Sequence, residues 1–196
     1  MHHHRDQLVA HLEGRVHLSI EHPVALGTAG ALVNLRDWID GRDVVVLNAD
    51  GWHTAELAPV IDGWDHERVR LLCVEDPDRG DFGTLHYTGV GLLPWPVVRD
   101  LPAGPIGLYD ACFAPAREAD TLDLVTAYGP FFDCGTPASY LAANLSWSGG
   151  ANVVGEGAVV EGVIERTVVW PGARVEAHEV LRDAVRADGG VTVQVT

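Results

Sequence analysis

The sequence predicts an α/β domain over residues 1–145, followed by a linker and a short hexapeptide-type β-helix over residues 146–196. Three observations predict this order. The run Val44-Val45-Val46-Leu47 is continuously apolar, which is typical of a strand buried on both faces of a parallel sheet. Strand-like and helix-like segments alternate around this run, which favours parallel strands joined by right-handed crossovers. Beyond residue 152, apolar residues instead recur every six positions, the mark of a β-helix.

The first half of the chain is organised around a tight turn into a helix. Gly27 gives the backbone conformational freedom there, and Thr28 is a suitable N-cap for a helix over 29–39. The apolar strand that follows delivers Asn48 and Asp50 to its carboxyl end. Because open α/β sheets bind ligands at that end, we expect a small-molecule site here.

The N-terminal segment is expected to begin with an amphipathic helix that carries Leu8 and Leu12. The triplet His2-His3-His4 is interpreted as native sequence, and as a metal site it is weak because three consecutive helical residues point in different directions. Alternation over 15–20 predicts a strand, and Pro23 ends it because the residue before proline is restricted to extended conformations.

The other elements follow with clear boundary signals. Gly89 and Gly91 interrupt a strand, which indicates either a β-bulge or a ligand that comes close to the backbone. Thr136 followed by Pro137 is an N-cap with proline at the first helical position. The expected elements are a helix over 54–61, strands over 69–74 and 85–93, helices over 94–100 and 108–117, a strand over 121–128 and a helix over 138–145.

The C-terminal segment has a different composition from the rest of the chain. Small-residue positions separate apolar residues at a spacing of six, which predicts about two β-helical coils. Because about three repeats are needed for independent stability, the tail must pack on its own domain or on a second subunit, and we expect an oligomer contact. The residues that carry the spacing are Val154, Val160, Val163, Val169, Val175 and Leu181.

Composition excludes several classes of protein. The formal net charge of −15 argues against a nucleic-acid partner, which requires a basic surface. The chain contains arginine but no lysine. Cys73, Cys112 and Cys134 are odd in number and have no metal-like spacing, which favours a reducing, cytoplasmic compartment. No run of about 18 apolar residues is available to span a bilayer, so no membrane partner is expected.

Four stretches carry a resemblance to a known family. The sequence Leu26-Gly-Thr-Ala-Gly-Ala-Leu32 with Leu47-Asn-Ala-Asp50, then Tyr87-Thr-Gly-Val-Gly91, then Phe132-Asp-Cys-Gly-Thr-Pro137 resembles the sugar-phosphate nucleotidyltransferases, or nucleoside-diphosphate-sugar pyrophosphorylases. The mannose-1-phosphate guanylyltransferase and N-acetylmuramate-1-phosphate uridylyltransferase types are the most similar. The resemblance implies a Rossmann-like, GT-A-like three-layer fold with a short left-handed β-helix at its C-terminus.

The resemblance also implies a reaction and a site. A sugar 1-phosphate would attack the α-phosphorus of a nucleoside triphosphate and release pyrophosphate, so that catalysis is positioning and charge neutralisation with Mg²⁺. Asp50 and Asp133 match the family's metal ligands. Each also follows an extended segment, so two strands can bring them to one edge, although an Asp that caps a turn is the plain alternative for either. The implied nucleotide-binding residues are Leu26, Gly27, Thr28 and Asn48, and the implied sugar-binding residues are Gly89 and Asp110.

One part of the family pattern is absent. The family opens with a strand and a glycine-rich, arginine-containing phosphate loop, and its phosphate-binding lysines have no counterpart in this chain. Arg70 or Arg79 would have to substitute for them in part. We therefore expect an N-terminally truncated domain with an exposed apolar strand edge and impaired catalysis, and we assign no catalytic side chain. The alternative is a non-catalytic nucleotide-sugar-binding homologue that regulates an active paralogue.

Overall fold

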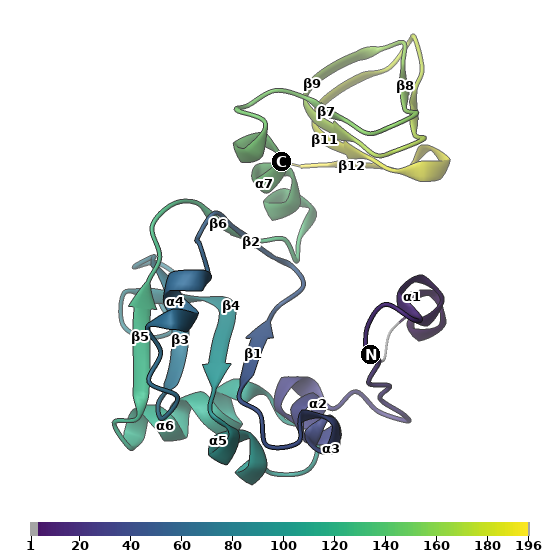
Figure 1. The fold of residues 1–196 in the computed structure, drawn as a ribbon. Coiled ribbons are helices and arrows are strands. Elements are labelled where there is room, and N and C mark those ends of the chain that lie inside the picture. Colours follow the sequence, from purple (N-terminus) through teal and green to yellow (C-terminus); the bar gives the residue numbers. More distant parts are fainter. Residues whose placement is uncertain (1–3, 196) are drawn as a thin grey trace. The chain divides into compact units, whose positions relative to one another are not determined.

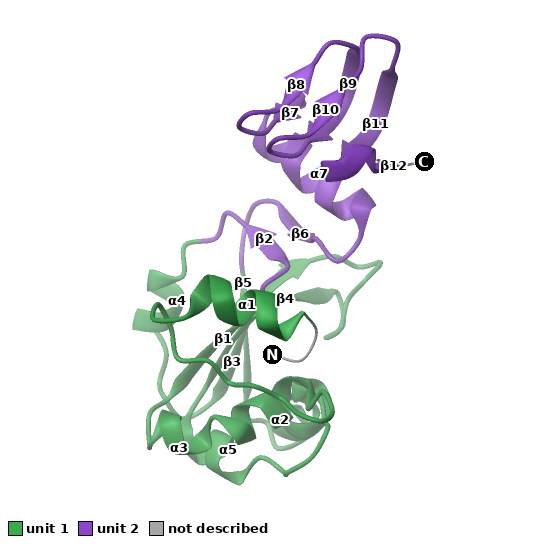
Figure 2. Ribbon diagram, turned by 90° about the vertical axis from the view of Figure 1, so that its right-hand side faces the viewer, with its two compact units in different colours: residues 1–47, 56–126 green, residues 48–55, 127–196 purple. Residues whose placement is uncertain are grey.

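The structure, a computed structural model, describes residues 4–195, so His2 and His3 of the histidine triplet lie outside the described residues. The chain forms two compact units (Figure 2): residues 1–47 and 56–126 make unit 1, and residues 48–55 and 127–196 make unit 2. This division differs from the predicted boundary at residue 145. The reason is that the helix expected at the end of the α/β domain packs instead on the valines of the tail, and two short strands belong with it.

Unit 1 is built on a mixed four-stranded sheet (Figure 1). Its strands are β1 (Val44–Leu47), β4 (Leu85–Leu93), β3 (Val69–Glu75) and β5 (Leu122–Thr126), in that spatial order. β4 runs antiparallel to both neighbours, and only the β3–β5 pair is parallel. The prediction of a parallel sheet around residues 44–47 was therefore wrong.

The strand β1 lies at the edge of this sheet and is not buried on both faces. Its residues alternate between partly buried and exposed, and the side chains of Val45 and Leu47 are 40% and 56% exposed. A continuous apolar run does not by itself distinguish a central strand from an edge strand, because the second neighbour of a strand is not encoded in its own sequence.

Helices cover both faces of the sheet and give unit 1 three layers. Apolar side chains at alternate β3 positions, Val69, Leu71 and Cys73, share a core with the helices of one layer. The intervening Arg70 instead donates a hydrogen bond to the carbonyl oxygen of Val60 in the other layer, at 3.0 Å. The first layer contains α2 (Gly27–Asn34), α3 (Arg36–Ile39), α5 (Trp95–Asp100), the π-helical turn η1 (Tyr109–Phe113) and α6 (Ala114–Glu118), and the second contains α4 (Ala58–Asp62).

Three sequence-based expectations in unit 1 need correction. Residues 15–20 form no strand, and the helix α1 (Arg5–Leu12) before them buries no residue. The helix expected over 54–61 begins later, at Ala58, because residues 51–53 form a strand. Thr28 is not the N-cap of α2, since the helix already begins at Gly27 and the Thr28 hydroxyl accepts a hydrogen bond from the Leu108 N–H at 3.0 Å.

A β-bulge interrupts β4 at the predicted glycine position. Leu72 pairs with Val90, but the next residue of β3 pairs with Tyr87, so Thr88 and Gly89 are the extra residues. Gly89 has a φ of +86°, which explains the glycine. The buried Thr88 hydroxyl donates to the carbonyl oxygen of Leu72 at 2.8 Å and closes the bulge. The bulge interpretation of this glycine is confirmed.

Unit 2 begins with a short antiparallel pair, β2 (Gly51–His53) and β6 (Phe131–Asp133), followed by α7 (Pro137–Trp147). The N-cap prediction for α7 is confirmed: the Thr136 hydroxyl accepts from the Ser139 N–H at 3.2 Å, and the Ser139 hydroxyl accepts from the Thr136 N–H at 3.3 Å. This capping box satisfies two N–H groups that have no partner within the helix.

The tail is a coil of short parallel strands. β7 (Val153–Val154), β9 (Val163–Val169) and β11 (Val180–Arg186) lie side by side, β12 (Thr192–Gln194) adds antiparallel to β11, and β8 (Val159–Val160) pairs with β10 (Arg174–Val175). The short helix η2 (Asp188–Gly190) connects β11 to β12. Repeated parallel return to the same sheets fits the predicted β-helix, and its left hand stays a prediction.

The six-residue spacing is correct for part of the coil interior. Val169, Val175 and Leu181 are buried together, but Val163 is 57% exposed and Ile164 packs inward in its place. Arg166 has a positive φ, so the side chains of β9 do not alternate continuously through this residue, although the register of β9 with β11 is the same on both sides of it.

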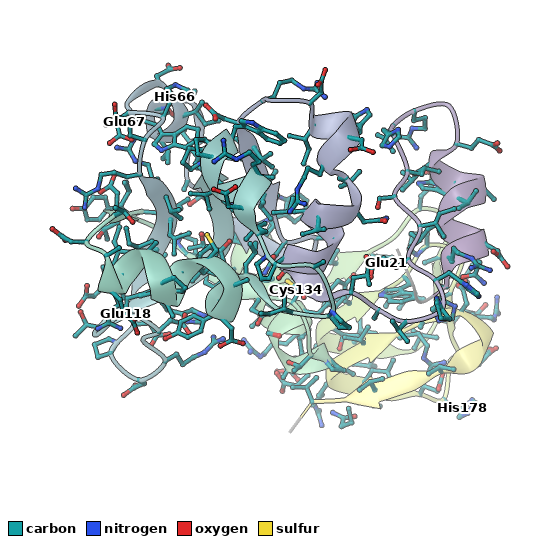
Figure 3. All side chains as sticks on the ribbon, turned by 90° about the horizontal axis from the view of Figure 1, so that it is seen from below. Glu21, His66, Glu67, Glu118, Cys134 and His178 are labelled. Atoms are coloured by element: carbon teal, nitrogen blue, oxygen red, sulfur yellow. The ribbon has the colours of Figure 1, made fainter. Side chains whose placement is uncertain are left out.

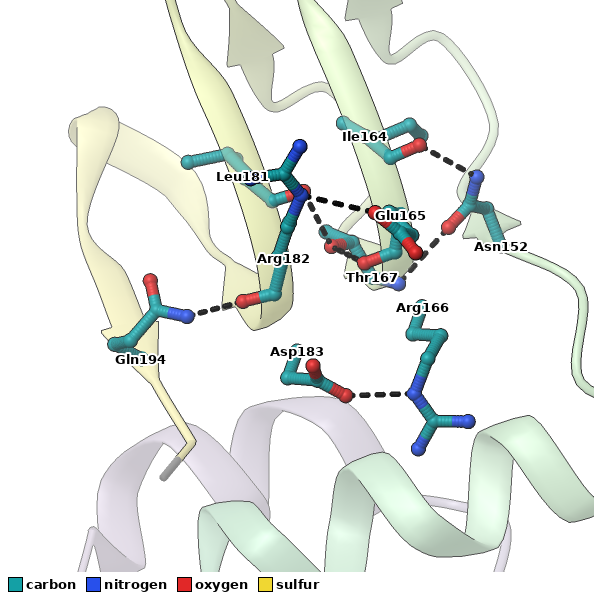
Figure 4. Close-up of polar contacts among 9 residues, drawn as sticks. All are labelled: Asn152, Ile164, Glu165, Arg166, Thr167, Leu181, Arg182, Asp183 and Gln194. Carbon is teal, nitrogen blue, oxygen red and sulfur yellow. Dashed lines mark hydrogen bonds and ion pairs between the residues drawn. The ribbon is translucent and has the colours of Figure 1, made fainter.

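The coil carries polar links between and along its strands (Figure 4). The Asn152 amide donates to the carbonyl oxygen of Ile164 at 3.1 Å and accepts from the N–H of Thr167 at 2.9 Å. Ion pairs join β9 to β11 at Arg166–Asp183 and Arg182–Glu165. Within residues 4–195, no helix is long and apolar enough to cross a membrane.

Candidate functional site

The two predicted metal ligands, Asp50 and Asp133, are brought together within unit 2. In the β2–β6 pair, Gly51 lies opposite Asp133, and the N–H of Cys134 donates to the carbonyl oxygen of Asp50 at 2.8 Å. Asp50 precedes one strand of this pair and Asp133 ends the other. The predicted juxtaposition is therefore present, although a separate two-stranded ribbon creates it and not the main sheet.

Both carboxylates face the space beside Gly135. A methyl group placed on Gly135 would lie 3.2 Å from Oδ1 of Asp133 and 3.8 Å from Oδ2 of Asp50. Both aspartates are exposed, and Oδ1 of Asp133 also accepts the Gly135 N–H at 3.1 Å. The turn-capping role and the ligand role are thus compatible for Asp133, since a carboxylate accepts several hydrogen bonds or metal bonds.

The charges of both aspartates act on the same neighbour. Burial raises the pKa of the Cys134 thiol, and the negative charges of Asp133 and Asp50 raise it further. Cys134 is half-buried (Figure 3) and, like Cys73 and Cys112, is a free thiol. This corner of unit 2 is therefore negatively charged and disfavours an additional anion unless a cation is present.

The residues at this corner fit a magnesium ion by their chemistry. Mg²⁺ prefers oxygen ligands and needs only one or two carboxylates, because it keeps several waters and binds substrate phosphates. Among the described residues, no group of three or more His, Cys, Asp or Glu side chains is placed to hold a metal. Asp50 and Asp133 are the two side chains that would hold the ion.

A pocket of about 240 Å³ lies next to these aspartates in unit 2. Trp52 and Cys134 form one side of it, and the α7 residues Tyr140, Asn144 and Trp147 form the other. The Trp52 ring packs on Phe132, with ring centroids 5.8 Å apart. Trp52, two residues after Asp50, therefore lines a pocket in unit 2.

In unit 1, the predicted nucleotide-binding turn is fixed by a neighbouring loop. The carbonyl oxygen of Leu26 accepts from the Ile106 N–H at 2.9 Å, and the Ile106 carbonyl oxygen accepts from the Ala29 N–H at 3.1 Å. Gly27 has a φ of +72°, and a Cβ there would lie 2.6 Å from the Ile106 oxygen. From the other side, the Glu21 carboxylate, marked in Figure 3, accepts the Leu26 N–H at 2.7 Å. The turn is thus rigid before any ligand binds.

The other predicted residues divide between the two units. Asp110 is exposed. It lies two residues after Leu108, whose N–H donates to the Thr28 hydroxyl, so Asp110 is tethered near the Thr28 turn. Gly89 is buried in the β4 bulge of the same unit. Asn48 is exposed in unit 2, two residues before Asp50.

Arg70, one of the two arginines proposed to replace the missing phosphate-binding lysines, already has partners within unit 1. Arg70 is largely buried, and its guanidinium is occupied by Asp123 at 2.6 Å and by the Val60 carbonyl oxygen. Its candidacy as a phosphate ligand is therefore wrong. In unit 2 each arginine pairs with a carboxylate, namely Arg166 with Asp183, Arg174 with Glu161 and Glu176, Arg182 with Glu165, and Arg186 with Glu179.

Sequence reasoning missed two features of these sites. Gly135 was noticed only as part of a motif, and the structure shows that it keeps the space between two carboxylates open. The 106–108 loop that secures the Thr28 turn carries no local signal, because it is some 80 residues away in sequence and contributes only backbone groups.

Solved structures of several sugar-phosphate nucleotidyltransferases share this fold. A protein described as a glucose-1-phosphate thymidylyltransferase from Bacillus anthracis, solved with sucrose, is 19% identical with a TM-score of 0.60 over 73% of this chain and 72% of its own. A Thermus thermophilus protein described as a mannose-1-phosphate geranyltransferase is 15% identical with a TM-score of 0.65 over 98% of this chain and 78% of its own. The UDP-glucose pyrophosphorylase of Acinetobacter baumannii is 20% identical with a TM-score of 0.54 over 74% and 66%.

These identities establish a shared fold and no more. No protein-family model and no curated protein matches the sequence.

Proposed function

We propose that this chain is a sugar-1-phosphate nucleotidyltransferase by lineage, of the guanylyl- or uridylyltransferase type. In the proposed reaction, a phosphate oxygen of the sugar 1-phosphate forms a bond to the α-phosphorus of a nucleoside triphosphate. The bond from that phosphorus to the bridging oxygen breaks, and pyrophosphate leaves. The observation that carries this proposal is the juxtaposition of Asp50 and Asp133 on the β2–β6 ribbon.

In this proposal Asp50 and Asp133 hold Mg²⁺, which would neutralise phosphate charge. In unit 1, the rigid turn of Leu26, Gly27 and Thr28 is the proposed nucleotide contact, and Gly89 and Asp110 are the proposed sugar contacts. In unit 2, Asn48 is the proposed nucleotide contact. Structures with the same fold have been solved with UTP and with sucrose. The chain's own contribution is to position the nucleotide. The Thr28 hydroxyl accepts the Leu108 N–H and keeps its own proton, which it would donate to the nucleotide.

A second function, non-catalytic binding of a nucleotide sugar, is favoured by a separate observation. The arginines of unit 2 are paired with carboxylates, Arg70 is paired in unit 1, and the chain has no lysine. A triphosphate carries about four negative charges and needs cationic partners, each such hydrogen bond being worth roughly 1.5–3 kcal/mol. A nucleoside diphosphate sugar needs fewer cationic partners. In the proposed regulatory role, the chain would pair with an active paralogue in the cytoplasm.

Pyrophosphate release separates these functions. The full chain would be assayed with Mg²⁺, each nucleoside triphosphate and a panel of sugar 1-phosphates, beside Asp50→Asn and Asp133→Asn. Asp37→Asn, which removes an exposed carboxylate from α3, is the matched control for the loss of one negative charge.

Turnover that both site variants abolish and Asp37→Asn leaves unchanged supports the enzyme. Absence of turnover, with a nucleoside diphosphate sugar bound in calorimetry and weakened in the site variants, supports the binding homologue. Turnover that is insensitive to Asp50 and Asp133 contradicts the assigned metal site, and neither turnover nor binding overturns both functions.

A further inference from the structure

The pocket between the β2–β6 ribbon and α7 has aromatic walls. Its volume is about 240 Å³, and both of its sides belong to unit 2, drawn in purple in Figure 2. Trp52 lies on the ribbon side, and Tyr140 and Trp147 lie on the helix side. Pockets for drug-sized ligands usually measure roughly 300–1,000 Å³, so this pocket suits a smaller molecule.

Two of these aromatic side chains are held in place by other rings of unit 2. The Trp52 ring packs on Phe132, with centroids 5.8 Å apart, and the Tyr140 ring packs edge-on against Trp170, with centroids 6.5 Å apart. Trp147, the last residue of α7, is instead 71% exposed. A ligand in the pocket would therefore meet ordered walls and would bury part of an exposed indole ring.

Negative charge lies beside the pocket. Cys134 lines it, directly follows Asp133 and donates its N–H to the carbonyl oxygen of Asp50 at 2.8 Å. Trp52, on the opposite strand of the ribbon, lies two residues after Asp50. Among the described residues that line the pocket, none is basic. A cation is therefore attracted to this part of unit 2, and an anion is repelled.

The C-terminal end of α7 adds to the preference for a cation. Ala143, Asn144 and Trp147 line the pocket from the last two turns of this helix. The carbonyl groups at a helix C-terminus carry partial negative charge, which a nearby Lys, Arg or His side chain stabilises. The structure describes α7 in full, and its last turn has no basic residue. A bound cation would supply the charge that this helix end lacks.

Asn144 gives the pocket a polar contact. Its amide nitrogen donates to the carbonyl oxygen of Tyr140 at 2.9 Å, which fixes the amide within the helix. The amide oxygen is left as an acceptor, so a ligand with a hydroxyl or N–H group would gain a hydrogen bond. A wholly apolar ligand that buried this oxygen would leave it without a partner.

We propose that this pocket binds a small organic ammonium ion that carries alkyl groups on its nitrogen and a hydrogen-bond donor. The faces of indole and phenol rings attract such ions, because the π-system makes the face negative, and aromatic pockets recognise quaternary ammonium groups in this way. Asp50 and Asp133 supply the opposite charge from the ribbon. This ligand is separate from the nucleotide and the sugar phosphate of the proposed function, and it binds on the α7 side of the ribbon.

The test is a titration of the full chain with choline chloride near neutral pH, followed by NMR of the indole N–H signals. Those of Trp52 and Trp147 are expected to shift and saturate, while that of Trp38 in unit 1 stays in place. Sodium chloride at the same concentrations is the control for ionic strength. The neutral isostere of choline, in which carbon replaces nitrogen, is expected to bind about threefold or more weakly, because it lacks the charge.

Two pairs of variants test the walls and the charge separately. Trp147→Leu keeps an apolar side chain but removes the π face, and it should raise the dissociation constant for choline by about threefold or more. Trp38→Leu replaces a half-exposed tryptophan of unit 1 and should have no effect. Asp133→Asn should also weaken choline binding, whereas Asp188→Asn, at an exposed position of unit 2 outside the pocket, should not.

Several results would overturn the proposal. They are the absence of saturable shifts at Trp52 and Trp147, equal affinities for choline and its neutral isostere, and equal effects of Asp133→Asn and Asp188→Asn. Circular dichroism verifies that each variant is folded, and the comparison of choline with its isostere needs only the wild-type chain. The titration contains no Mg²⁺ and no nucleotide, so its outcome is independent of the proposed nucleotidyl transfer.

Discussion

The N–H of Cys134 donates a hydrogen bond to the carbonyl oxygen of Asp50 at 2.8 Å, and this contact aligns the two aspartates of unit 2. It continues the β2–β6 ladder by one step beyond the pairing of Gly51 with Asp133. Two exposed carboxylates repel each other, so their proximity requires a backbone scaffold of this kind. The backbone scaffold therefore places the two carboxylates that would hold a cation.

The first prediction concerns Gly135. Gly135→Ala would place a methyl group 3.2 Å from Oδ1 of Asp133 and 3.8 Å from Oδ2 of Asp50, in the space that a shared cation needs. We expect Mg²⁺ affinity, measured by calorimetry, to fall by about tenfold or more. Thermal stability should change little, since Gly135 is exposed and does not have a positive φ.

The control for this substitution is Gly107→Ala. Gly107 also lacks a positive φ, and no atom lies within 4 Å of its Cβ position, so the added methyl group has open space. Mg²⁺ affinity equal in the wild-type chain and Gly135→Ala would show that the ion, if it binds, does not use the space between the two aspartates.

The second prediction concerns the Thr28 hydroxyl. Thr28→Val keeps the shape of the side chain but leaves the Leu108 N–H without its acceptor, which should lower the free energy of unfolding by about 1–2 kcal/mol in urea titrations. Thr28→Ser retains the acceptor and should lose less. If Thr28→Val has the same urea midpoint as the wild type, the hydrogen bond does not stabilise this turn. The proposed role of Thr28 would then be ligand binding alone.

How much of this structure could be predicted from the sequence depends on how local each signal is. The N-cap at Thr136 and the bulge at Gly89 are encoded within a few residues: the N-cap was predicted, and the bulge was one of two interpretations of the glycine. The three-layer architecture was expected from the family resemblance, whereas the alternation of strands and helices alone predicted a parallel sheet. The edge position of β1 and its antiparallel pairing with β4 depend on a partner about 45 residues away. The apolar run alone therefore led to the wrong prediction of a strand buried in a parallel sheet.

The candidate site shows the same limit. Asp50 and Asp133 were expected to lie together because they match the family's metal ligands and because each follows an extended segment, and the structure does bring them together. The ribbon that joins them was not visible, because strands of three residues such as Gly51–His53 carry too short a pattern. In the tail, Val163 was assigned to the interior by its spacing, but it is exposed, and the positive φ of Arg166 between Val163 and Val169 interrupts the alternation on which that spacing depends.

The third prediction concerns the thiols. Burial raises the pKa of Cys73 and of Cys112 to about 12, with the charge of Asp81 adding to the effect at Cys73. At pH 8 these two thiols should react with a disulfide reagent only when unit 1 opens, whereas the half-buried Cys134 should react in the native state. Cys134→Ser should remove the fast phase alone. Two fast phases would show that unit 1 is open at Cys73 or Cys112 without denaturant.

The last prediction concerns the ion pair at Glu179 and Arg186 in the tail. Arg186 is 5% exposed, and its guanidinium contacts the Glu179 carboxylate and donates to the Arg174 carbonyl oxygen at 3.0 Å. The hydrogen bond from Arg186 holds the pKa of Glu179 below its ordinary value of 4.5. A carboxyl group whose folded pKa is depressed stabilises the fold fully above its unfolded pKa and loses this contribution as the pH falls through the folded pKa.

Glu179→Gln should therefore be less stable than the wild type at pH 7, and the difference in urea midpoint should shrink below about pH 4.5. A difference that is constant from pH 7 to pH 3 would mean that Glu179 acts through packing and not through its charge.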